Sequence, residues 1–343
     1  MSAVAESATA VPLLELRDVS KRFVKRLDLA GRAARLLGAN LRDEVVHAVD
    51  HVSLVIRPGE VVGLVGESGC GKSTLGRLAV GLHIPSSGTR IWKGSNVARA
   101  PRVARAARLA IQMIFQDPYA SLNPRMRVND IVGEAPVAHG LISRNEQADY
   151  VADLMARVGL DASLARRFPH QFSGGQRARI GIARALAVKP EFLVCDEAVA
   201  ALDVSIQAQV LNLFIRLRDE LNLTYLFISH DLGVVRHLSD RVVIMYLGRV
   251  VESAPAEQLF EAPNHPYSKA LLAEAPTLAV RKKTFVAIQG EIPSPLHPPS
   301  GCHFHPRCPY ASKVPGNRCS VEAPPLLQIA PARYSACHLN DPR

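Results

Sequence analysis

The stretch Gly66-Glu-Ser-Gly-Cys-Gly-Lys-Ser-Thr74, preceded by the apolar run Val61-Val-Gly-Leu-Val65, decides the fold of this chain. It fits the pattern G-x-x-x-x-G-K-[ST], in which backbone N–H groups surround phosphate oxygens. The apolar run predicts a buried parallel strand, and residues 72–82 predict a helix whose N-terminus faces the anion. Because strand, loop and helix occur in this order, we expect a phosphate-binding loop rather than a glycine-rich turn without a ligand.

Each residue type in this loop has a chemical reason. Lys72 can reach the β- and γ-phosphates, and the Ser73 hydroxyl is a ligand for Mg²⁺. Glycine is needed because a Cβ would block the close approach of phosphate to the backbone. The residues expected to hold the nucleotide are Gly66, Ser68, Gly69, Cys70, Gly71, Lys72, Ser73 and Thr74.

A second apolar run, Pro190-Glu-Phe-Leu-Val-Cys-Asp-Glu197, ends in two adjacent carboxylates. In proteins with such a loop, an acid at the position of Asp196 holds the Mg²⁺ shell, and the next carboxylate can activate the attacking water. We therefore predict Glu197 as the general base. The alternative is an acidic pair on a solvated surface, which the end of an apolar strand argues against.

Two further polar side chains follow apolar runs. His230 comes after Thr224-Tyr-Leu-Phe-Ile228, and Gln116 comes after Ile111-Gln-Met-Ile-Phe115. We expect His230 to contact the γ-phosphate and Gln116 to join the Mg²⁺–water network without adding charge. A structural histidine and an ordinary polar loop residue are the alternatives.

The order of these motifs resembles that of the ATP-binding subunits of ABC transporters over about residues 12–255. Walker A (66–74), the Q-loop (Gln116), the signature (173–176), Walker B (193–196), the D-loop (201–203) and the switch His230 follow one another as in that family. Four more stretches are similar to the oligopeptide, dipeptide and nickel importer ATPases: Ile114 to Pro124, Ala201 to Gln209, His265-Pro-Tyr267 and Gly290 to Pro295. The residues 71–76 and 117–122 resemble the second of two paired subunits.

The resemblance implies an α/β fold, with a P-loop NTPase (RecA-like) core, an ABC-type helical subdomain and an antiparallel β subdomain. Residues 1–255 would form this domain, with the helical subdomain at about 118–185. Residues 256–343 would form a small extension rich in cysteine and proline. About 120 residues separate Lys72 from Asp196, which also calls for an inserted subdomain. Helical spacing at Val137, Leu141, Val151, Leu154 and Val158, broken at Gly140, supports it.

The family also implies a head-to-tail dimer in which each ATP lies between Walker A of one cassette and the signature of the other. The residues that would complete the opposing site are Ser173, Gly174, Gly175, Gln176 and the D-loop Asp203. Phe23 would stack on adenine. Without the resemblance, the Ser-Gly-Gly turn is a helix cap and Phe23 a core residue. Ala198 and Ala200 replace the usual proline and serine, which puts communication between the two sites in doubt.

The implied function is ATP hydrolysis that powers peptide import. The implied partners are two permease subunits, a second ATPase chain in a heterodimer and, indirectly, an extracytoplasmic peptide-binding protein, with no nucleic acid. The chain has 343 residues and a net charge of +10, is 48% hydrophobic, and lacks an apolar run of membrane-spanning length. Residues 1–10 do not read as a signal peptide. We expect a peripheral protein on the cytoplasmic face of the bacterial inner membrane.

Three alternatives bear on the function and on one insertion. The basic charge also suits a soluble ABC-type ATPase acting on nucleic acid or ribosomes, although such proteins have tandem cassettes or a long coiled-coil insertion. A regulatory module without turnover would have lost Glu197 or His230, and both are present. The basic segment from Lys25 to Arg42 is expected to be a solvated hairpin or short helix, with contact to an anionic membrane surface as the alternative.

The C-terminal extension concentrates cysteine and proline. Its prolines exclude long helices after about residue 293. Cys302, Cys308, Cys319 and Cys337 have the spacing C-x5-C-x10-C-x17-C, which is not that of a zinc ribbon. Four thiolates can hold a [4Fe–4S] cluster or zinc, and the resemblance favours the cluster, with no metal as the alternative. His303, His305 and His338 are spare ligands, and Cys195 is expected to be a small buried hydrophobe.

Overall fold

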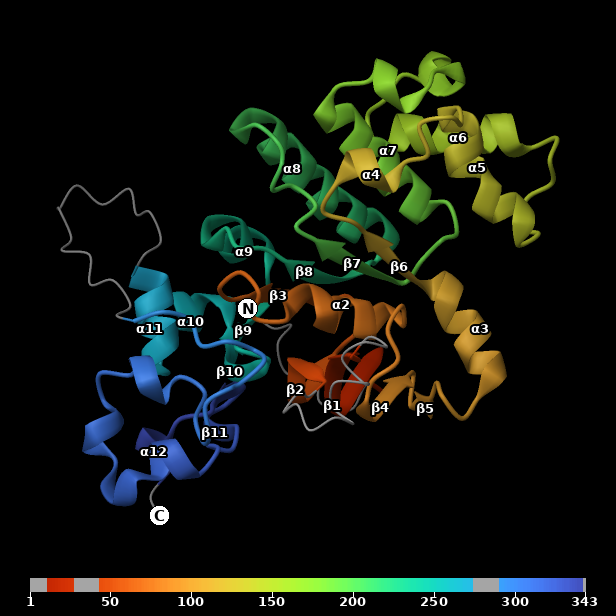
Figure 1. The fold of residues 1–343 in the computed structure, drawn as a ribbon. Helices are drawn as coiled ribbons and strands as arrows, with labels where there is room; N and C mark the ends of the chain where they lie inside the picture. Colours follow the sequence, from red (N-terminus) through yellow and green to blue (C-terminus); the bar gives the residue numbers. More distant parts are fainter. Residues whose placement is uncertain (1–10, 28–42, 274–289, 342–343) are drawn as a thin grey trace.

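The computed structural model describes residues 11–27, 43–273 and 290–341 of the chain. Two sheets and a lobe of helices follow one another across the molecule (Figure 1). The C-terminal region, which comprises the described residues from 256 onward, lies at one edge of the larger sheet. Residues 28–42, most of the basic segment from Lys25 to Arg42, and the first ten residues lie outside the described residues. None of the described helices is both long enough and apolar enough to cross a lipid bilayer.

The larger sheet contains the strands that the apolar runs predict. Its order is β11-β12-β10-β9-β3-β8-β7-β6, with parallel pairing from β6 to β9 and antiparallel pairing from β9 to β11. Its strands are β3 (Val61–Val65), β6 (Ile111–Ile114), β7 (Phe192–Asp196), β8 (Thr224–Ile228), β9 (Arg241–Tyr246), β10 (Arg249–Pro255), β11 (Leu327–Ala330) and β12 (Arg333–Ser335).

Successive side chains along the parallel strands point into two different cores, so both faces of this sheet are buried. In β8, Leu226 and Ile228 face the core that contains helix α2 (Lys72–Val80), whereas Tyr225 and Phe227 face the core that contains helix α8 (Val204–Leu221). Because successive side chains point to opposite faces, a strand covered on both sides must be apolar throughout. This explains why the runs at 61–65, 192–196 and 224–228 carry no polar alternation.

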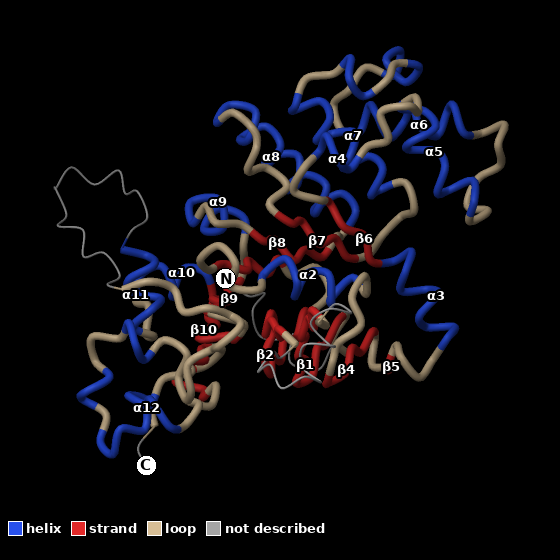
Figure 2. Tube along the Cα trace, viewed as in Figure 1, coloured by secondary structure: helices blue, strands red, loops and turns tan. Residues whose placement is uncertain are grey.

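The smaller sheet is antiparallel and covers α2 from the other side. Its order is β2-β1-β4-β5, and α2 lies between the two sheets (Figures 1 and 2). Its strands are β1 (Leu14–Lys25), β2 (Glu44–Ile56), β4 (Ser87–Trp92) and β5 (Ser95–Asn96). The predicted fold class, a P-loop core with an antiparallel β subdomain and a helical subdomain, is confirmed.

The remaining helices cover the sheets or form the lobe. The described α-helices other than α2 and α8 are α3 (Pro101–Ala110), α4 (Pro118–Ser121), α5 (Val128–Ala138), α6 (Gln147–Arg157), α7 (Gly174–Leu186), α9 (Leu232–Leu238), α10 (Ala256–Glu261), α11 (Pro266–Ala273) and α12 (Arg318–Val321). Short 3-10 helices are η1 (Ala162–Arg166), η2 (Pro169–Gln171), η3 (His305–Arg307), η4 (Ala311–Lys313), η5 (Pro315–Asn317) and η6 (His338–Asn340).

Helices α4 to α7 gather into one lobe, as the helical spacing predicts (Figure 1). Val151, Leu154 and Val158 are buried in its core. Val137 is only half-buried and Leu141 is 40% exposed, because α5 ends at Ala138 and the chain turns before the predicted stripe is complete.

The C-terminal region is short of regular structure, as its prolines predict. Figure 2 shows mostly loop there, and the longest α-helix described after residue 290 is the four-residue α12. Its main anchor is aromatic: Phe304 packs edge-on against Tyr246 of β9, with ring centroids 5.2 Å apart, and also contacts Tyr267 of α11. The region is therefore joined to the main sheet through a shared apolar core.

Candidate active site

The predicted phosphate-binding loop, residues 66–74, runs from the end of β3 into the first turn of α2 and is confined by the neighbouring backbone. Gly66 and Gly71 have φ values of 154° and 104°. A Cβ at Gly66 would clash with the Met245 carbonyl oxygen, and one at Gly71 would clash with that of Ala48. Both positions therefore need glycine for a steric reason as well as for their backbone conformation.

Lys72 and the first turn of α2 face this loop. The Lys72 ammonium donates to the carbonyl oxygens of Gly66, at 2.7 Å, and Glu67, at 3.0 Å. Its side chain is only 5% exposed, so a buried cation stands beside the loop. No side chain caps α2 at Gly71, which leaves its N-terminal amides directed at the loop. A cation and a helix N-terminus together favour a bound anion.

Ser73, in the first turn of α2, meets Asp196, the last residue of β7. The Ser73 hydroxyl donates to Asp196 Oδ1 over 2.8 Å. Burial raises the pKa of Asp196, against the lowering effect of the Ser73 hydrogen bond. A hydroxyl and a desolvated carboxylate are hard oxygen ligands, and a divalent cation would relieve the cost of burying the charge. The residues present thus fit Mg²⁺.

Two predicted residues, Gln116 and His230, lie against the carboxylate of a third, Glu197. Gln116 Nε2 donates to Glu197 Oε2 over 2.7 Å, and His230 Nδ1 lies 3.5 Å from Glu197 Oε1. Glu197 has a φ of 48°, in the left-handed region, and its amide donates to Ile228 of the neighbouring strand β8. The fold therefore holds Glu197 in a costly backbone conformation and orients its carboxylate with two side chains. In this structure Gln116 contacts Glu197 rather than the Ser73–Asp196 pair.

The predicted signature residues lie apart from this group. Ser173 caps α7 reciprocally with Gln176: the Gln176 amide donates to Ser173 Oγ over 3.3 Å, and the Ser173 amide donates to Gln176 Oε1 over 3.0 Å. A Cβ at Gly175 would clash with Ile206 of α8, and Gly174 approaches Leu202 of the D-loop. Figure 1 shows α7 and α2 on opposite sides of the main sheet. Within one molecule, the turn is the helix cap that its sequence alone favours.

Two other predicted residues are at the surface. Asp203 is exposed at the N-terminus of α8, and Phe23 is 39% exposed on β1. Phe23 packs edge-on against His83, with Lys21 Nζ 5.1 Å from its ring centroid. It is therefore available for stacking rather than part of the core. Ala198 is 8% exposed and belongs to the core shared with the helical lobe.

Sequence reasoning missed three residues around the loop. Arg307 forms an ion pair with Glu67, and the Glu67 amide donates to the Tyr267 hydroxyl. His265-Pro-Tyr267 carries a family resemblance but no role followed from it, and nothing near Arg307 distinguishes it from other basic residues. Contacts between residues 200 or more positions apart leave no local pattern to detect.

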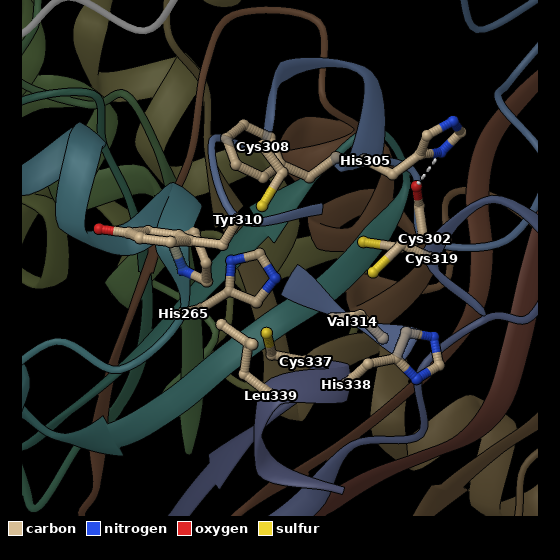
Figure 3. Close-up of a pocket in the computed structure, with 12 residues that line it drawn as sticks. His265, Cys302, His305, Cys308, Tyr310, Val314, Cys319, Cys337, His338 and Leu339 are labelled. Atoms are coloured by element: carbon tan, nitrogen blue, oxygen red, sulfur yellow. Dashed lines mark hydrogen bonds between the residues drawn. The ribbon is translucent and has the colours of Figure 1, made fainter. Parts of the chain in front are cut away.

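The expectation of an iron–sulfur cluster, with zinc as the lesser choice, is wrong on this structure. Cys302, Cys308, Cys319 and Cys337 do line one pocket, and Figure 3 shows their sulfurs around it. However, no group of three or more His, Cys, Asp or Glu side chains in the described ranges is placed to hold a metal ion. The pocket also has apolar walls, and burial raises the pKa of all four thiols, that of Cys302 to about 12. Burial therefore favours neutral thiols over thiolate ligands. Cys195 is buried, as expected, and Cys70 of the phosphate-binding loop is buried as well.

Comparison with known sequences agrees with the class of protein that this geometry defines, an ABC-type ATPase. The family described as ABC transporter matches residues 49–200. The family described as oligopeptide/dipeptide transporter, C-terminal region, matches residues 251–314. A dimeric structure of the ATP-binding cassette MJ0796 bound to ADP and Pi superposes with a TM-score of 0.60 at 26% identity, covering 71% of this chain and 98% of that one.

Individual relatives place the chain more narrowly among the ABC-type ATPases. This chain is 47% identical over 338 residues to the oligopeptide transport ATP-binding protein AppF of Bacillus subtilis, covering 97% of this chain and 99% of that protein. It is 48% identical over 295 residues to the di/tripeptide transport ATP-binding protein DppF of Pseudomonas aeruginosa, covering 85% and 90%. The chain belongs to the family of oligopeptide and dipeptide ABC transporter ATP-binding proteins, and it is an ATPase.

Proposed function

We propose that this protein hydrolyses ATP to power the import of peptides through an ABC permease, working as one cassette of a head-to-tail dimer. One observation carries the proposal: Ser73–Asp196 and Gln116–Glu197–His230 meet at neighbouring strand ends beside a loop with a buried lysine. Peptide as the cargo rests on the relatives, which are named as oligopeptide and di/tripeptide transport proteins.

Nucleotide binding is assigned to the loop and the first turn of α2. Lys72 would exchange its two carbonyl partners for phosphate oxygens, because an ammonium binds a polyanion more strongly than a neutral carbonyl. Ser73 and Asp196 would hold Mg²⁺, which would offset the negative charge of the phosphates. Phe23 would stack on the adenine ring from the smaller sheet.

Hydrolysis is assigned to Glu197, with Gln116 and His230 beside it. The Glu197 carboxylate would accept a proton from, or orient, the water that attacks the γ-phosphate. Gln116 and His230 occupy its two oxygens in this structure, so both must share or release them when water enters. They are therefore placed to couple the general base to the γ-phosphate and to the loop that contains Gln116.

The second cassette would complete the site. Ser173, Gly174, Gly175 and Gln176 lie on the far side of the sheet from α2, so they would serve the nucleotide of another molecule, with Asp203 beside them. The cap already directs the N-terminus of α7 outward, and an approaching γ-phosphate would find a hydroxyl and helix amides there. We propose that the second cassette is a paired ATPase chain rather than a second copy of this one.

The proposed setting is the cytoplasmic face of the bacterial inner membrane, where two permease subunits tether the protein and an extracytoplasmic binding protein supplies the peptide.

We also propose that residues 1–255 form the ABC domain, with residues 118–185 as its helical subdomain, and residues 256–343 the extension. Ala198 and Ala200 are proposed to loosen coupling between the two sites. The relatives give no support to the alternative action on nucleic acid or ribosomes.

Transport in a defined system tests this function. The protein is purified with its co-purifying membrane subunits, reconstituted into proteoliposomes, and supplied with MgATP, labelled di- and oligopeptides and the cognate binding protein. We expect peptide accumulation that stops without ATP. ATP hydrolysis without uptake of any peptide, together with uptake of a different solute, would overturn the cargo assignment; binding to nucleic acid without membrane partners would overturn the setting.

A further inference from the structure

The C-terminal region reaches into the phosphate-binding loop through a buried ion pair. Arg307 Nη1 donates to Glu67 Oε2 over 3.0 Å, and Arg307 Nη2 donates to Glu67 Oε1 over 3.1 Å. The side chain of Arg307 is 6% exposed and that of Glu67 21%. Two parallel N–H···O bonds fix the direction of the carboxylate as well as its distance, which a single charge contact would not do.

The same region also holds the backbone of Glu67. The Glu67 amide donates to the Tyr267 hydroxyl over 2.9 Å, and Tyr267 is fully buried. Tyr246 lies between these partners: its hydroxyl is 3.3 Å from Arg307 Nη1, and its ring centroid is 4.7 Å from that of Tyr267. The side chain and the amide of one loop residue are thus both fixed from outside the ABC domain.

Glu67 passes this constraint to the lysine of the site. Its carbonyl oxygen accepts from Lys72 Nζ over 3.0 Å and from the Cys70 amide over 3.3 Å. The position of this carbonyl therefore determines both the turn of the loop and the resting place of the lysine. A rotation of the 67–68 peptide would disturb every one of these contacts.

Arg307 is itself placed by the core of the C-terminal region. Arg307 is the last residue of η3, which directly follows Phe304, a side chain that is 2% exposed. In the same segment, His303 Nδ1 lies 2.8 Å from the Leu247 carbonyl oxygen. Burial lowers the pKa of Arg307, but the hydrogen bonds to Glu67 and Tyr246 outweigh this and raise it, so the cation is retained. A guanidinium fixed in this way acts as part of the loop's framework.

We propose that the C-terminal region is a working part of the ATP site: Arg307 and Tyr267 are positioning residues that hold Glu67, and through it the phosphate-binding loop, in the form that accepts ATP. The ordered loop binds phosphate without a further ordering cost, so losing the contact should weaken nucleotide binding rather than the chemical step. A contact that served stability alone would lower the unfolding temperature and leave nucleotide affinity unchanged.

Nucleotide affinity of the full-length chain tests the proposal. Fluorescent mant-ATP with Mg²⁺ is titrated into the wild type, Arg307→Gln, Glu67→Gln and the double variant. We expect each single variant to weaken binding about tenfold, which corresponds to about 1.4 kcal/mol. The double variant should be no weaker than either single one, because both changes remove the same contact. Arg307→Lys should recover part of the loss, since it keeps the charge but not the two parallel hydrogen bonds.

Arg318→Gln is the matched control in the same region. Arg318 also pairs with two carboxylates, at 2.7 Å to Asp341 and 3.3 Å to Glu322, but these belong to the C-terminal region itself. We expect its mant-ATP affinity to equal that of the wild type. Equal weakening by Arg318→Gln, unchanged binding by Arg307→Gln, or additive losses in the double variant would each overturn the proposal.

Two further measurements keep the test decisive if Arg307→Gln does not fold. Tyr267→Phe removes only the acceptor of the Glu67 amide and should weaken mant-ATP binding by about threefold; wild-type affinity in this variant would contradict the proposal. By reciprocity, MgATP should slow hydrogen exchange of the amides at 302–308 in the wild-type chain. Exchange there that ignores MgATP would also contradict it. In the assembled transporter, KM for ATP should rise while kcat changes little.

Discussion

The strand ends of the parallel sheet and the C-terminal region are built in different ways. At the strand ends, Asp196 ends β7, Glu197 follows it and His230 lies two residues after β8, while Ser73 begins α2 after the loop from β3. The parallel sheet brings these residues to one edge. The C-terminal region has little regular structure after residue 290 and depends on the packing of Phe304 and on single contacts such as Arg307–Glu67. The comparison shows that a regular sheet can organise a site from local motifs, whereas an irregular region acts through individual long-range contacts.

The largest expected effect comes from removing Glu197, the proposed general base at the strand ends. Glu197→Gln should lower ATP hydrolysis by about 10²–10⁴-fold, because an amide cannot accept the proton of water. ATP binding should persist, since Lys72 and Ser73 are unchanged, and the variant should favour a closed dimer. Phosphate release by the reconstituted transporter and size-exclusion chromatography with ATP measure the two effects.

Glu191→Gln is the control for this change. Glu191 lies just before the other end of the same strand and pairs with Lys93 at the surface, over 2.6 Å. It should hydrolyse ATP at the wild-type rate. Normal turnover by Glu197→Gln would remove Glu197 from its proposed role and would weaken the view that this edge of the sheet concentrates the chemistry.

A smaller effect is expected from the backbone around the loop. Gly71→Ala would place a Cβ against the Ala48 carbonyl oxygen at a φ of 104°, so we expect a loss of about 1–3 kcal/mol in the free energy of unfolding. Gly69→Ala separates the two causes, because a Cβ there has nothing within 4 Å although φ is 78°. Urea denaturation should show a clearly smaller loss for Gly69→Ala, and equal losses would mean that backbone conformation alone decides.

The stability of the C-terminal region should depend on pH through His265. Burial lowers the pKa of His265 to about 3, and Nδ1 accepts from the Tyr267 amide, so the folded chain keeps the ring neutral. Unfolding restores a pKa near 6.5, so the unfolded state binds more protons between about pH 6.5 and 3. Stability should therefore fall as the pH falls through this window, by at most about 1.4 kcal/mol per pH unit from this group.

Thermal unfolding at several pH values checks this expectation, with His265→Gln as the comparison. The glutamine variant has no group that titrates in the window and should show a flatter pH profile. Identical profiles for the two proteins would show that the unfolding of residues 256–341 does not limit the measured transition.

The smallest expected effect is at the signature turn. Ser173→Ala removes the acceptor for the Gln176 amide and should lower the free energy of unfolding by about 1 kcal/mol. Asp161→Ala removes the corresponding cap of η1, where Oδ1 accepts from the Ser163 amide over 2.8 Å. Both should cost similar stability, but only Ser173→Ala should also slow hydrolysis in the assembled dimer. Equal rates for the two variants would limit Ser173 to the cap seen here.

Much of the candidate site could be predicted because its motifs are local. The apolar runs before Gly66, Asp196 and His230 predict buried strands, and the carboxyl ends of parallel strands meet at one edge. The prediction of a helical apolar stripe at 137–158 was less accurate, since Leu141 lies beyond the end of α5 and is exposed. The four cysteines and the family resemblance gave a wrong metal site, because neither reveals the apolar walls and burial around the thiols.

The sequence by itself determined the phosphate-binding loop, the order of the catalytic motifs and the irregular character of the C-terminal region, because each depends on residues close together in the chain. Only the tertiary structure decided that Arg307 and Tyr267 hold Glu67, that Gln116 and His230 share the Glu197 carboxylate, and that the signature turn faces away from α2. Such contacts arise when packing brings distant segments together, and no local pattern of residue types specifies which side chains will then meet.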